Sequence, residues 1–386
     1  MPSDSPSLGL MTFDDEAPSV EGIATALATD FLRRGNYNAS TGPITLALDI
    51  GGSAISLGEA DSFVSFLSLP DDPHEGFAEL QVQSVGFDDS SPEPSVHLYL
   101  IRAPARLIKS LPPEIGGVPL KVHKMGPVSV RPDAAGTTTN RGNLFERDGR
   151  VCCGSSCAPT SENSSGTLGA LVRIARADQI YLLSNNHVFA GCNHVPKNQP
   201  ILAPSSGDGR PDITAPREIG RHEMISPLAS GSPNFVTPCD TDIALARATN
   251  PAVISSWQGS ALQGYDTPTS ITSPLSFMKV KKFGRTTGLT FGTVEAKVTT
   301  PTPITYNSKH FKGVVWFRDI WTIRADGKEP FALGGDSGSL VVTEDGSEAV
   351  GLVFAANTTG EYAWIVPMSA VVDAFGGLSL VGDHGV

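Results

Sequence analysis

The stretch Phe331-Ala-Leu-Gly-Gly-Asp-Ser-Gly-Ser-Leu-Val-Val342 begins as a turn and ends as an apolar strand. Gly334 and Gly335 allow the backbone to fold tightly directly before Ser337. Such a turn can direct the backbone N–H groups of Gly335 and Ser337 at one point, where a carbonyl oxygen becomes negative when Ser337 attacks the carbon. The stretch therefore predicts a nucleophilic serine, with an oxyanion hole made of Gly335 and Ser337.

A serine hydroxyl reacts only beside a base, so the chain must supply a histidine and a carboxylate elsewhere. His187 stands at the end of an apolar strand-like run, and Asp242 stands at the start of another. Asp240 competes for the acid position, but Asp242 directly precedes the apolar residues. The chain order His, Asp, Ser is one of the known orders of a catalytic triad. We therefore predict a triad of His187, Asp242 and Ser337.

These three segments resemble the trypsin/chymotrypsin-like serine peptidases. A fourth segment, KKFGRTTGLTFGTV at 281–294, narrows the resemblance. Together with GTLGALV at 166–172, SNNHV at 184–188 and GDSGSLVV at 335–342, it is similar to bacterial trypsin-like peptidases related to the plant NARROW LEAF1 protein. The resemblance covers residues 166–380 well and the first 130 residues loosely. It implies a double β-barrel that carries the triad.

The resemblance also implies a substrate pocket, with Phe331 near its floor and Phe354 and Ala356 on its wall. No acid stands at position 331, so an apolar or small substrate side chain is expected, rather than Lys or Arg. In trypsin the aspartate that matches Asp336 pairs with a newly cut N-terminus. Here a long segment precedes the barrels, so we expect Arg285 or backbone donors to hold Asp336 instead.

The turn-rich pattern predicts a mainly β fold. The resemblance implies that this fold is a chymotrypsin-like double β-barrel, and the elements before it predict a small α/β N-terminal domain. Residues 133–165 are rich in Gly, Thr, Ser, Asn and Cys, which predicts an irregular connector. The predicted units are a disordered tail (1–18), an α/β accessory domain (19–132), the connector (133–165) and a peptidase domain (166–386), whose barrels cover about 166–250 and 275–386.

Local patterns predict individual elements on either side of the connector. Residues 20–34 have apolar side chains at helical spacing and basic residues in the last turn, which is typical of an amphipathic helix. Strands are predicted over 44–48, 54–57, 64–69, 80–85, 96–101 and 118–123 in the N-terminal domain, with a short helix over 107–111, and later over 314–323, with a last helix over 369–375.

The composition excludes several classes of partner. With 386 residues and a formal net charge of −12, the chain offers no basic surface for nucleic acid or for an anionic membrane. It has no apolar run long enough to span a membrane and no basic segment followed by an apolar core at its start, so we expect a cytoplasmic protein.

The five cysteines are an odd number, which does not fit a fully paired disulfide framework. Cys152, Cys153, Cys157, Cys192 and His194 do not have the spacing of a recognised zinc motif, so these thiols are predicted to be buried or in loops. The predicted chemistry requires no cofactor and no metal.

Two functions from different classes follow. The first is a serine endopeptidase that cleaves protein or peptide substrates through an acyl-enzyme, and the same triad would also hydrolyse esters. The second is a binding or regulatory module on a protease scaffold, with slow or partner-gated catalysis. The plant relatives imply self-assembly, so a homo-oligomer is expected.

Overall fold

The structure is a computed structural model of the whole chain. It describes residues 19–33, 80–130, 133–134, 144–162, 164–175, 178–209, 215–232, 236–299 and 301–386. The tail predicted over 1–18 and the strands predicted over 44–48, 54–57 and 64–69 lie outside these residues. None of the described helices is both long and apolar enough to cross a membrane.

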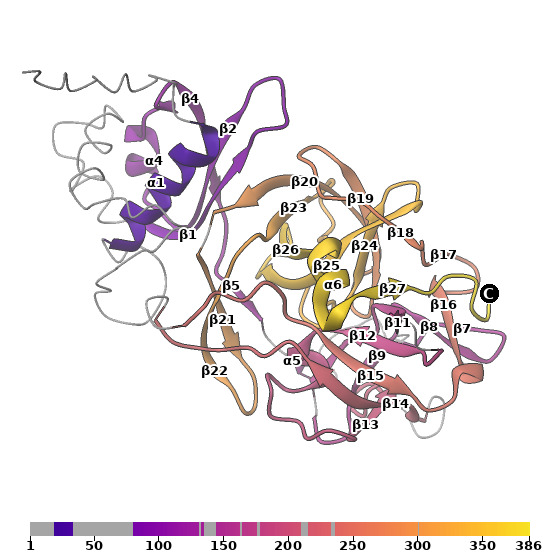
Figure 1. Ribbon diagram of the computed structural model, residues 1–386. Helices are drawn as coiled ribbons and strands as arrows, with labels where there is room; N and C mark the ends of the chain where they lie inside the picture. Colours follow the sequence, from indigo (N-terminus) through magenta and orange to yellow (C-terminus); the bar gives the residue numbers. More distant parts are fainter. Residues whose placement is uncertain are drawn as a thin grey trace, which may run out of the picture.

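The N-terminal unit is a helix packed on a small sheet (Figure 1). Ile23, Leu27 and Phe31 lie on one face of the helix and are almost fully buried against Val82 and Leu98 of the sheet. The helices and strands predicted within the described part of this unit are confirmed. The elements are α1 (Val20–Arg33), β1 (Gln81–Asp88), β2 (Ser95–Arg102), α4 (Ala105–Ser110), β3 (Glu114–Ile115) and β4 (Val118–Lys124).

The second barrel is a closed ring of six strands, in which each strand pairs with the next and the last pairs with the first. Its interior is filled by buried aliphatic and aromatic side chains. In ring order the strands are β19 (Lys279–Gly284), β20 (Gly288–Val298), β23 (Trp321–Ala325), β26 (Tyr362–Pro367), β25 (Glu348–Asn357) and β24 (Leu340–Thr343).

The N-terminal sheet is continuous with this barrel, because β1 pairs with β20. The pairing is short and joins Gly86 to Val298 and Phe87 to Lys297. A side chain at position 86 would come within 2.9 Å of the Lys297 carbonyl oxygen, so a glycine permits this close approach.

The first barrel is built from a nine-stranded sheet around a separate apolar core. The mainly β, chymotrypsin-like double-barrel fold expected from the sequence is confirmed. In sheet order the strands are β27 (Leu378–Leu380), β11 (Ala170–Ile174), β12 (Tyr181–Ser184), β15 (Ala244–Ala248), β14 (Arg217–Ile225), β13 (Pro200–Ala203), β9 (Ser156–Pro159), β10 (Ser164–Thr167) and β6 (Asp133–Ala134).

The composition predicted an irregular connector over 133–165, but the described residues of this stretch contribute several strands to the sheets. Cys152 and Cys153 are fully buried, and their strand pairs in parallel with residues that follow Ile254. Small polar residues and thiols fit between closely packed strands, so a loop-like composition was misleading here. The additional sheet contains β7 (Glu146–Arg147), β8 (Arg150–Cys153), β16 (Ile254–Gly259) and β17 (Gly264–Asp266).

The predicted single strand over 314–323 is also corrected, because it is two strands separated by a turn at Asp319, which has a positive φ of 54°. The helix predicted over 369–375 is present as α6. The remaining elements are β5 (Val128–Val130), α5 (Asn186–Phe189), η1 (Pro251–Val253), β18 (Ser270–Ile271), β21 (Thr302–Asn307), β22 (Lys312–Phe317), α6 (Met368–Asp373) and η2 (Ala374–Gly376).

Candidate active site

Ser337 is the second residue in the second of two consecutive tight turns. The Asp336 N–H donates to the Leu333 carbonyl at 3.0 Å, and the Ser339 N–H donates to the Asp336 carbonyl at 3.0 Å. The third residue of each turn is a glycine with a positive φ, 92° at Gly335 and 95° at Gly338. Positive φ at this position is characteristic of a type II turn. Glycine is therefore the residue that both turns require.

The first barrel holds this pair of turns through Thr167. The Thr167 N–H donates to the Ser337 carbonyl at 2.8 Å, and the Thr167 hydroxyl donates to the Gly335 carbonyl at 2.8 Å. Ser184, at the end of β12, donates its hydroxyl to the Thr167 carbonyl at 2.7 Å. Because His187 follows Ser184 by one short turn of chain, these contacts bring the serine turn to the strand end that carries His187.

His187 and Asp242 form a buried pair at the edge of the first barrel. His187 Nδ1 lies 2.6 Å from Asp242 Oδ2, with the two side chains 7% and 0% exposed. The His187 backbone N–H donates to Asp242 Oδ1 at 3.2 Å, and the Asn185 amide donates to the Asp242 carbonyl at 2.6 Å. A proton held on Nδ1 by the carboxylate leaves Nε2 as the acceptor, which is the state that a general base needs.

Asp240, the competing acid, is not near His187. Its carboxylate is half exposed and forms an ion pair with Arg318. The geometry therefore brings Asp242, and not Asp240, to the histidine.

Tyr306 was not singled out from the sequence, but it completes the surroundings of Asp242. Its hydroxyl donates to Asp242 Oδ2 at 2.7 Å, and its ring meets the His187 ring edge-on at 5.9 Å between centroids. Burial, followed by the neighbouring Asp242 carboxylate, raises the pKa of Tyr306 well above its usual value, so the hydroxyl remains a donor. A tyrosine alternating with buried residues on a strand carries no local sign of this role.

Tyr306→Phe is expected to weaken the site without dismantling it. A hydrogen bond to a charged group contributes about 1.5–3 kcal/mol, so the free energy of unfolding should fall by about that amount. Reaction of Ser337 with an active-site probe should slow by a few-fold, because Asp242 keeps both bonds to His187. Tyr181→Phe, on a strand of the first barrel, is the control for urea unfolding and labelling. An unchanged unfolding midpoint in Tyr306→Phe would contradict this role.

The Ser337 hydroxyl is directed at the Phe354 carbonyl, at 3.5 Å. Among the described residues it makes no hydrogen bond to His187. Catalytic hydrogen bonds are often long or poorly aligned before substrate binds, so the missing bond does not rule out His187 as the base. Within the same part of the chain, the N–H groups of Gly335 and Ser337 donate to no acceptor. Both donors are therefore available for an oxyanion.

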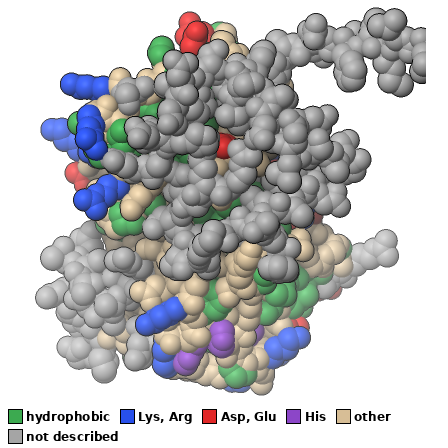
Figure 2. Space-filling view, turned by 90° about the vertical axis from the view of Figure 1, so that its left-hand side faces the viewer, with side chains coloured by type: hydrophobic (Ala, Val, Ile, Leu, Met, Phe, Trp, Pro, Cys, Tyr) green, Lys and Arg blue, Asp and Glu red, His purple; other side chains and the backbone are tan. Residues whose placement is uncertain are grey.

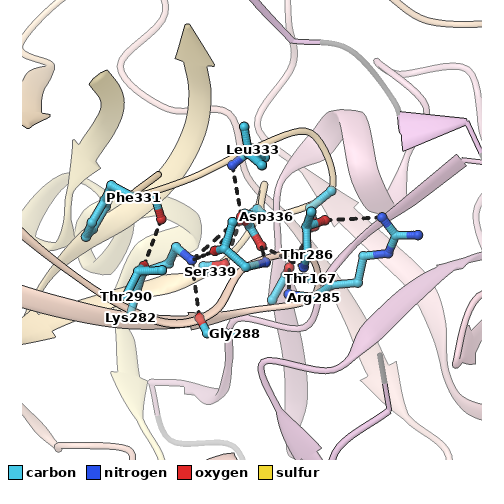
Figure 3. Close-up of polar contacts among 12 residues, drawn as sticks. Thr167, Lys282, Arg285, Thr286, Gly288, Thr290, Phe331, Leu333, Asp336 and Ser339 are labelled. Atoms are coloured by element: carbon cyan, nitrogen blue, oxygen red, sulfur yellow. Dashed lines mark hydrogen bonds and ion pairs between the residues drawn. The ribbon is translucent and has the colours of Figure 1, made fainter. Parts of the chain in front are cut away.

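Asp336 fixes the serine turn through hydrogen bonds of its carboxylate (Figure 3). Its Oδ1 accepts the N–H groups of Thr286 at 2.8 Å and Thr287 at 3.2 Å. Its Oδ2 accepts the Thr287 hydroxyl at 2.8 Å and the Leu333 N–H at 2.9 Å. Either Arg285 or backbone donors were expected to hold Asp336, and the structure shows the backbone donors.

Arg285 pairs instead with Asp208 of the first barrel, through two nitrogen–oxygen contacts. The cation near Asp336 is Lys282, whose Nζ lies 3.7 Å from Oδ2 with both side chains fully buried. Burial lowers the pKa of Lys282, and the Asp336 carboxylate opposes that shift. Lys282 also donates to the Thr287 hydroxyl at 2.5 Å.

Lys282→Met is expected to destabilise the protein by about 3–5 kcal/mol, because it leaves a buried carboxylate without its cation. The turn that carries Gly335 should then lose its fixed geometry, and labelling of Ser337 should slow in the folded fraction. Thermal unfolding and labelling rates measure the two effects. Lys279→Met, whose side chain is 53% exposed, is the matched control. Equal stabilities for the two variants would argue against a structural role of Lys282.

The predicted pocket residues lie close to the serine turn but differ in exposure. Phe331 and Phe354 are fully buried, and Phe331 packs in the core of the second barrel. The Phe331 carbonyl accepts the Thr290 hydroxyl at 2.8 Å (Figure 3). Ala356 is partly exposed near the end of β25. The assignment of a substrate pocket to these three residues stays a prediction.

A short strand from the N-terminal side of the chain lies along β25 beside the serine. In β5, Ser129 pairs with Ala356 and Val128 pairs with Asn357, in antiparallel register. The other edge of β5 pairs in parallel with β21, where Val130 is the partner of Tyr306. The edge of β25 at Ala356 and Asn357, close to the Phe354 carbonyl that faces Ser337, is therefore already paired with β5.

The cysteines predicted to be buried or in loops are free thiols. Burial raises the pKa of Cys152 to about 11 and of Cys192 to about 12. Cys153 faces the Ser255 carbonyl, whereas Cys192 lies beside Ser308. The raised pKa values keep these thiols protonated at neutral pH.

The chain has a chymotrypsin-like double β-barrel fold. No family model and no curated protein matches the chain. Among solved structures, the chain is similar to a glutamic acid specific serine protease, with 20% identity and a TM-score of 0.41 over 60% of this chain and 100% of that chain. It is also similar to Thermobifida fusca protease A, with 19% identity and a TM-score of 0.40 over 60% of this chain and 98% of that chain. A third similar structure is Cellulomonas bogoriensis chymotrypsin, with 17% identity and a TM-score of 0.38 over 60% and 97% of the two chains.

Proposed function

We propose that this protein is a serine endopeptidase that hydrolyses peptide bonds through Ser337, His187 and Asp242. The observation that carries the proposal is the buried 2.6 Å contact between His187 Nδ1 and Asp242 Oδ2. It stands beside a serine turn whose two N–H groups have no acceptor among the described residues. A base, its orienting acid, a nucleophile and oxyanion donors are the parts that acyl transfer requires.

In the proposed reaction, His187 Nε2 takes the proton of the Ser337 hydroxyl while the oxygen attacks the substrate carbonyl carbon. The oxyanion accepts hydrogen bonds from the N–H groups of Gly335 and Ser337. The tetrahedral intermediate then expels the amine, which receives the proton from His187, and an ester to Ser337 remains. Water, deprotonated by His187, attacks that ester and releases the carboxylic acid and the free serine. Asp242 keeps its charge throughout and stabilises the imidazolium.

The finer assignments belong to the same proposal. We place the protein near the bacterial peptidases related to NARROW LEAF1, with an N-terminal accessory domain, a cytoplasmic location and self-association. The substrate is a protein or peptide with an apolar or small side chain at the cleavage site. Light scattering of the purified chain tests self-association, and peptide-library cleavage tests the preference.

Labelling with a fluorophosphonate probe tests the proposed chemistry. Wild-type protein should be labelled at Ser337, and Ser337→Ala should not be labelled. Ser347→Ala, in a turn of the second barrel, should be labelled like the wild type. Hydrolysis of an unfolded protein substrate should disappear with the label. Labelling that persists in Ser337→Ala would identify another nucleophile and overturn the proposal.

The second candidate is a regulatory module whose catalysis is gated, and β5 is the observation that favours it. An extended peptide often binds by adding a strand to an exposed sheet edge. The edge of β25 beside Ser337 is already paired with Ser129 of the same chain. Gating of this kind would leave the triad intact, but hydrolysis would be slow until β5 is displaced from β25.

A further inference from the structure

Two histidines and a glutamate meet where the N-terminal unit joins the second barrel, away from Ser337. His97 lies on β2, His123 on β4 and Glu295 on β20. Each offers one ligand atom, and these atoms lie within 4.8 Å of one another. In the described part of the chain this is the one group of three such side chains. We propose that His97, His123 and Glu295 bind a zinc ion.

The hydrogen bonds around the two rings leave the correct nitrogens for a metal. His97 Nε2 lies 3.1 Å from the Ser95 hydroxyl, and His123 Nδ1 lies 3.2 Å from the Tyr362 hydroxyl. Their other nitrogens, His97 Nδ1 and His123 Nε2, are 3.0 Å apart. Zinc-binding histidines characteristically use one ring nitrogen for the metal and hydrogen-bond through the other. The two facing nitrogens are therefore the ligands, and without metal a single N–H···N bond joins them.

Glu295 is held in the same manner. The Tyr99 hydroxyl donates to Glu295 Oε2 at 3.0 Å, which leaves Oε1 for the metal. Oε1 also lies 3.8 Å from His123 Nδ1 and 3.6 Å from Arg324 Nε. The Arg324 side chain is 54% exposed and can turn into solvent. Two imidazoles and one carboxylate form a ligand set that zinc accepts, and a water molecule fills the fourth position.

The location gives such a site a structural consequence. The backbone pairing between the N-terminal unit and the second barrel joins Gly86 to Val298 and Phe87 to Lys297. A metal ligated by β2, β4 and β20 would add a further attachment to this pairing and to the hydrogen bond from Tyr99 to Glu295. Zinc binding should therefore stabilise the native protein, because a ligand that binds the folded chain alone shifts the unfolding equilibrium.

The test uses untagged, full-length protein that has been treated with a chelator, loaded with Zn²⁺ and dialysed. We expect about one zinc ion per chain by elemental analysis, and a higher unfolding temperature with Zn²⁺ than without. Glu295→Gln removes the charge but keeps an acceptor for Tyr99, and it should lose the bound zinc and the temperature shift. His123→Asn should do the same.

Figure 2 shows that histidine side chains also lie on the surface at the lower end of the molecule, so binding there must be separated from the proposed site. His310→Ala, whose ring is 41% exposed, is the control for surface binding. His187→Ala is the control for binding at the candidate active site. Both should retain zinc. Wild-type protein without bound zinc, or a Glu295→Gln protein with the same zinc content as wild type, would overturn the proposal. If His123→Asn does not fold, the conservative Glu295→Gln variant decides.

Discussion

Asp242→Asn is expected to slow the reaction of Ser337 by about 10⁴-fold while the protein remains folded. The carboxylate of Asp242 accepts from His187 Nδ1 and therefore keeps the proton on that nitrogen. An amide at the same position can present its N–H₂ group to Nδ1, which would then act as an acceptor. The proton moves to Nε2, and the base can no longer take the serine proton.

The labelling rate of Asp242→Asn is set by the catalytic groups that the substitution leaves unchanged. The oxyanion donors and the serine turn are untouched, so the variant should keep the residual rate that they supply. The measurement is the second-order rate constant of fluorophosphonate labelling, followed as a function of pH. Thermal unfolding of the same sample tests whether the fold is intact.

Asp240→Asn is the matched control, because it makes the same chemical change two residues earlier. Asp240 is half exposed and pairs with Arg318, so its loss should leave the labelling rate within about twofold, as for most surface changes. If the two variants are equally slow, the acid of the triad has been assigned wrongly. If neither is slow, neither carboxylate orients the base for Ser337.

The sequence predicted those parts of the site whose chemistry is local. The glycines around Ser337 and the strand end before His187 carry their function in neighbouring residues, so a single string reveals them. Tyr306 is 64 residues from Asp242, and the residues next to it in sequence do not predict the hydrogen bond between the two side chains. Its role depends on how the strands between the barrels pack.

Lys282 illustrates a second limit of sequence reasoning. In a strand that follows Val280, a run of lysines is typical of a solvated edge. In the structure Lys282 is fully buried, because Asp336 and the Thr287 hydroxyl surround its ammonium group. The burial of this charge depends on partners from a distant turn, which an alternating pattern cannot encode. The same reason explains why the thiol-rich strands at 150–159 resembled a connector.

Ser129→Pro is expected to accelerate labelling of Ser337 on the order of 100-fold, if β5 keeps the competent state near a population of about 1%. Ser129 pairs with Ala356 on one side and Thr305 on the other. Proline removes the backbone N–H that a strand needs, so it weakens this three-stranded arrangement at its centre. The edge of β25 then becomes free to pair with an extended substrate.

Ser270→Pro is the control, because β18 pairs with the opposite end of β25 through Ser270 and Glu348. It introduces the same residue into a strand of the same sheet, away from Ser337, and should not raise the labelling rate. A synthetic peptide of residues 124–130 should slow the labelling of Ser129→Pro again, because it can reoccupy the edge. Thermal unfolding must show that both variants are folded.

The outcomes separate gating from catalysis, since the triad and β5 make different contributions to the labelling rate. If wild type and Ser129→Pro are labelled equally fast, the serine works and β5 is a structural strand. If neither is labelled, the endopeptidase proposal itself fails. Faster labelling that the peptide reverses would mean that the chain carries its own competitor for the substrate edge. Val128 and Val130 are 3% exposed, so this competitor is held by apolar packing as well as by backbone pairing, and a natural activator must replace both.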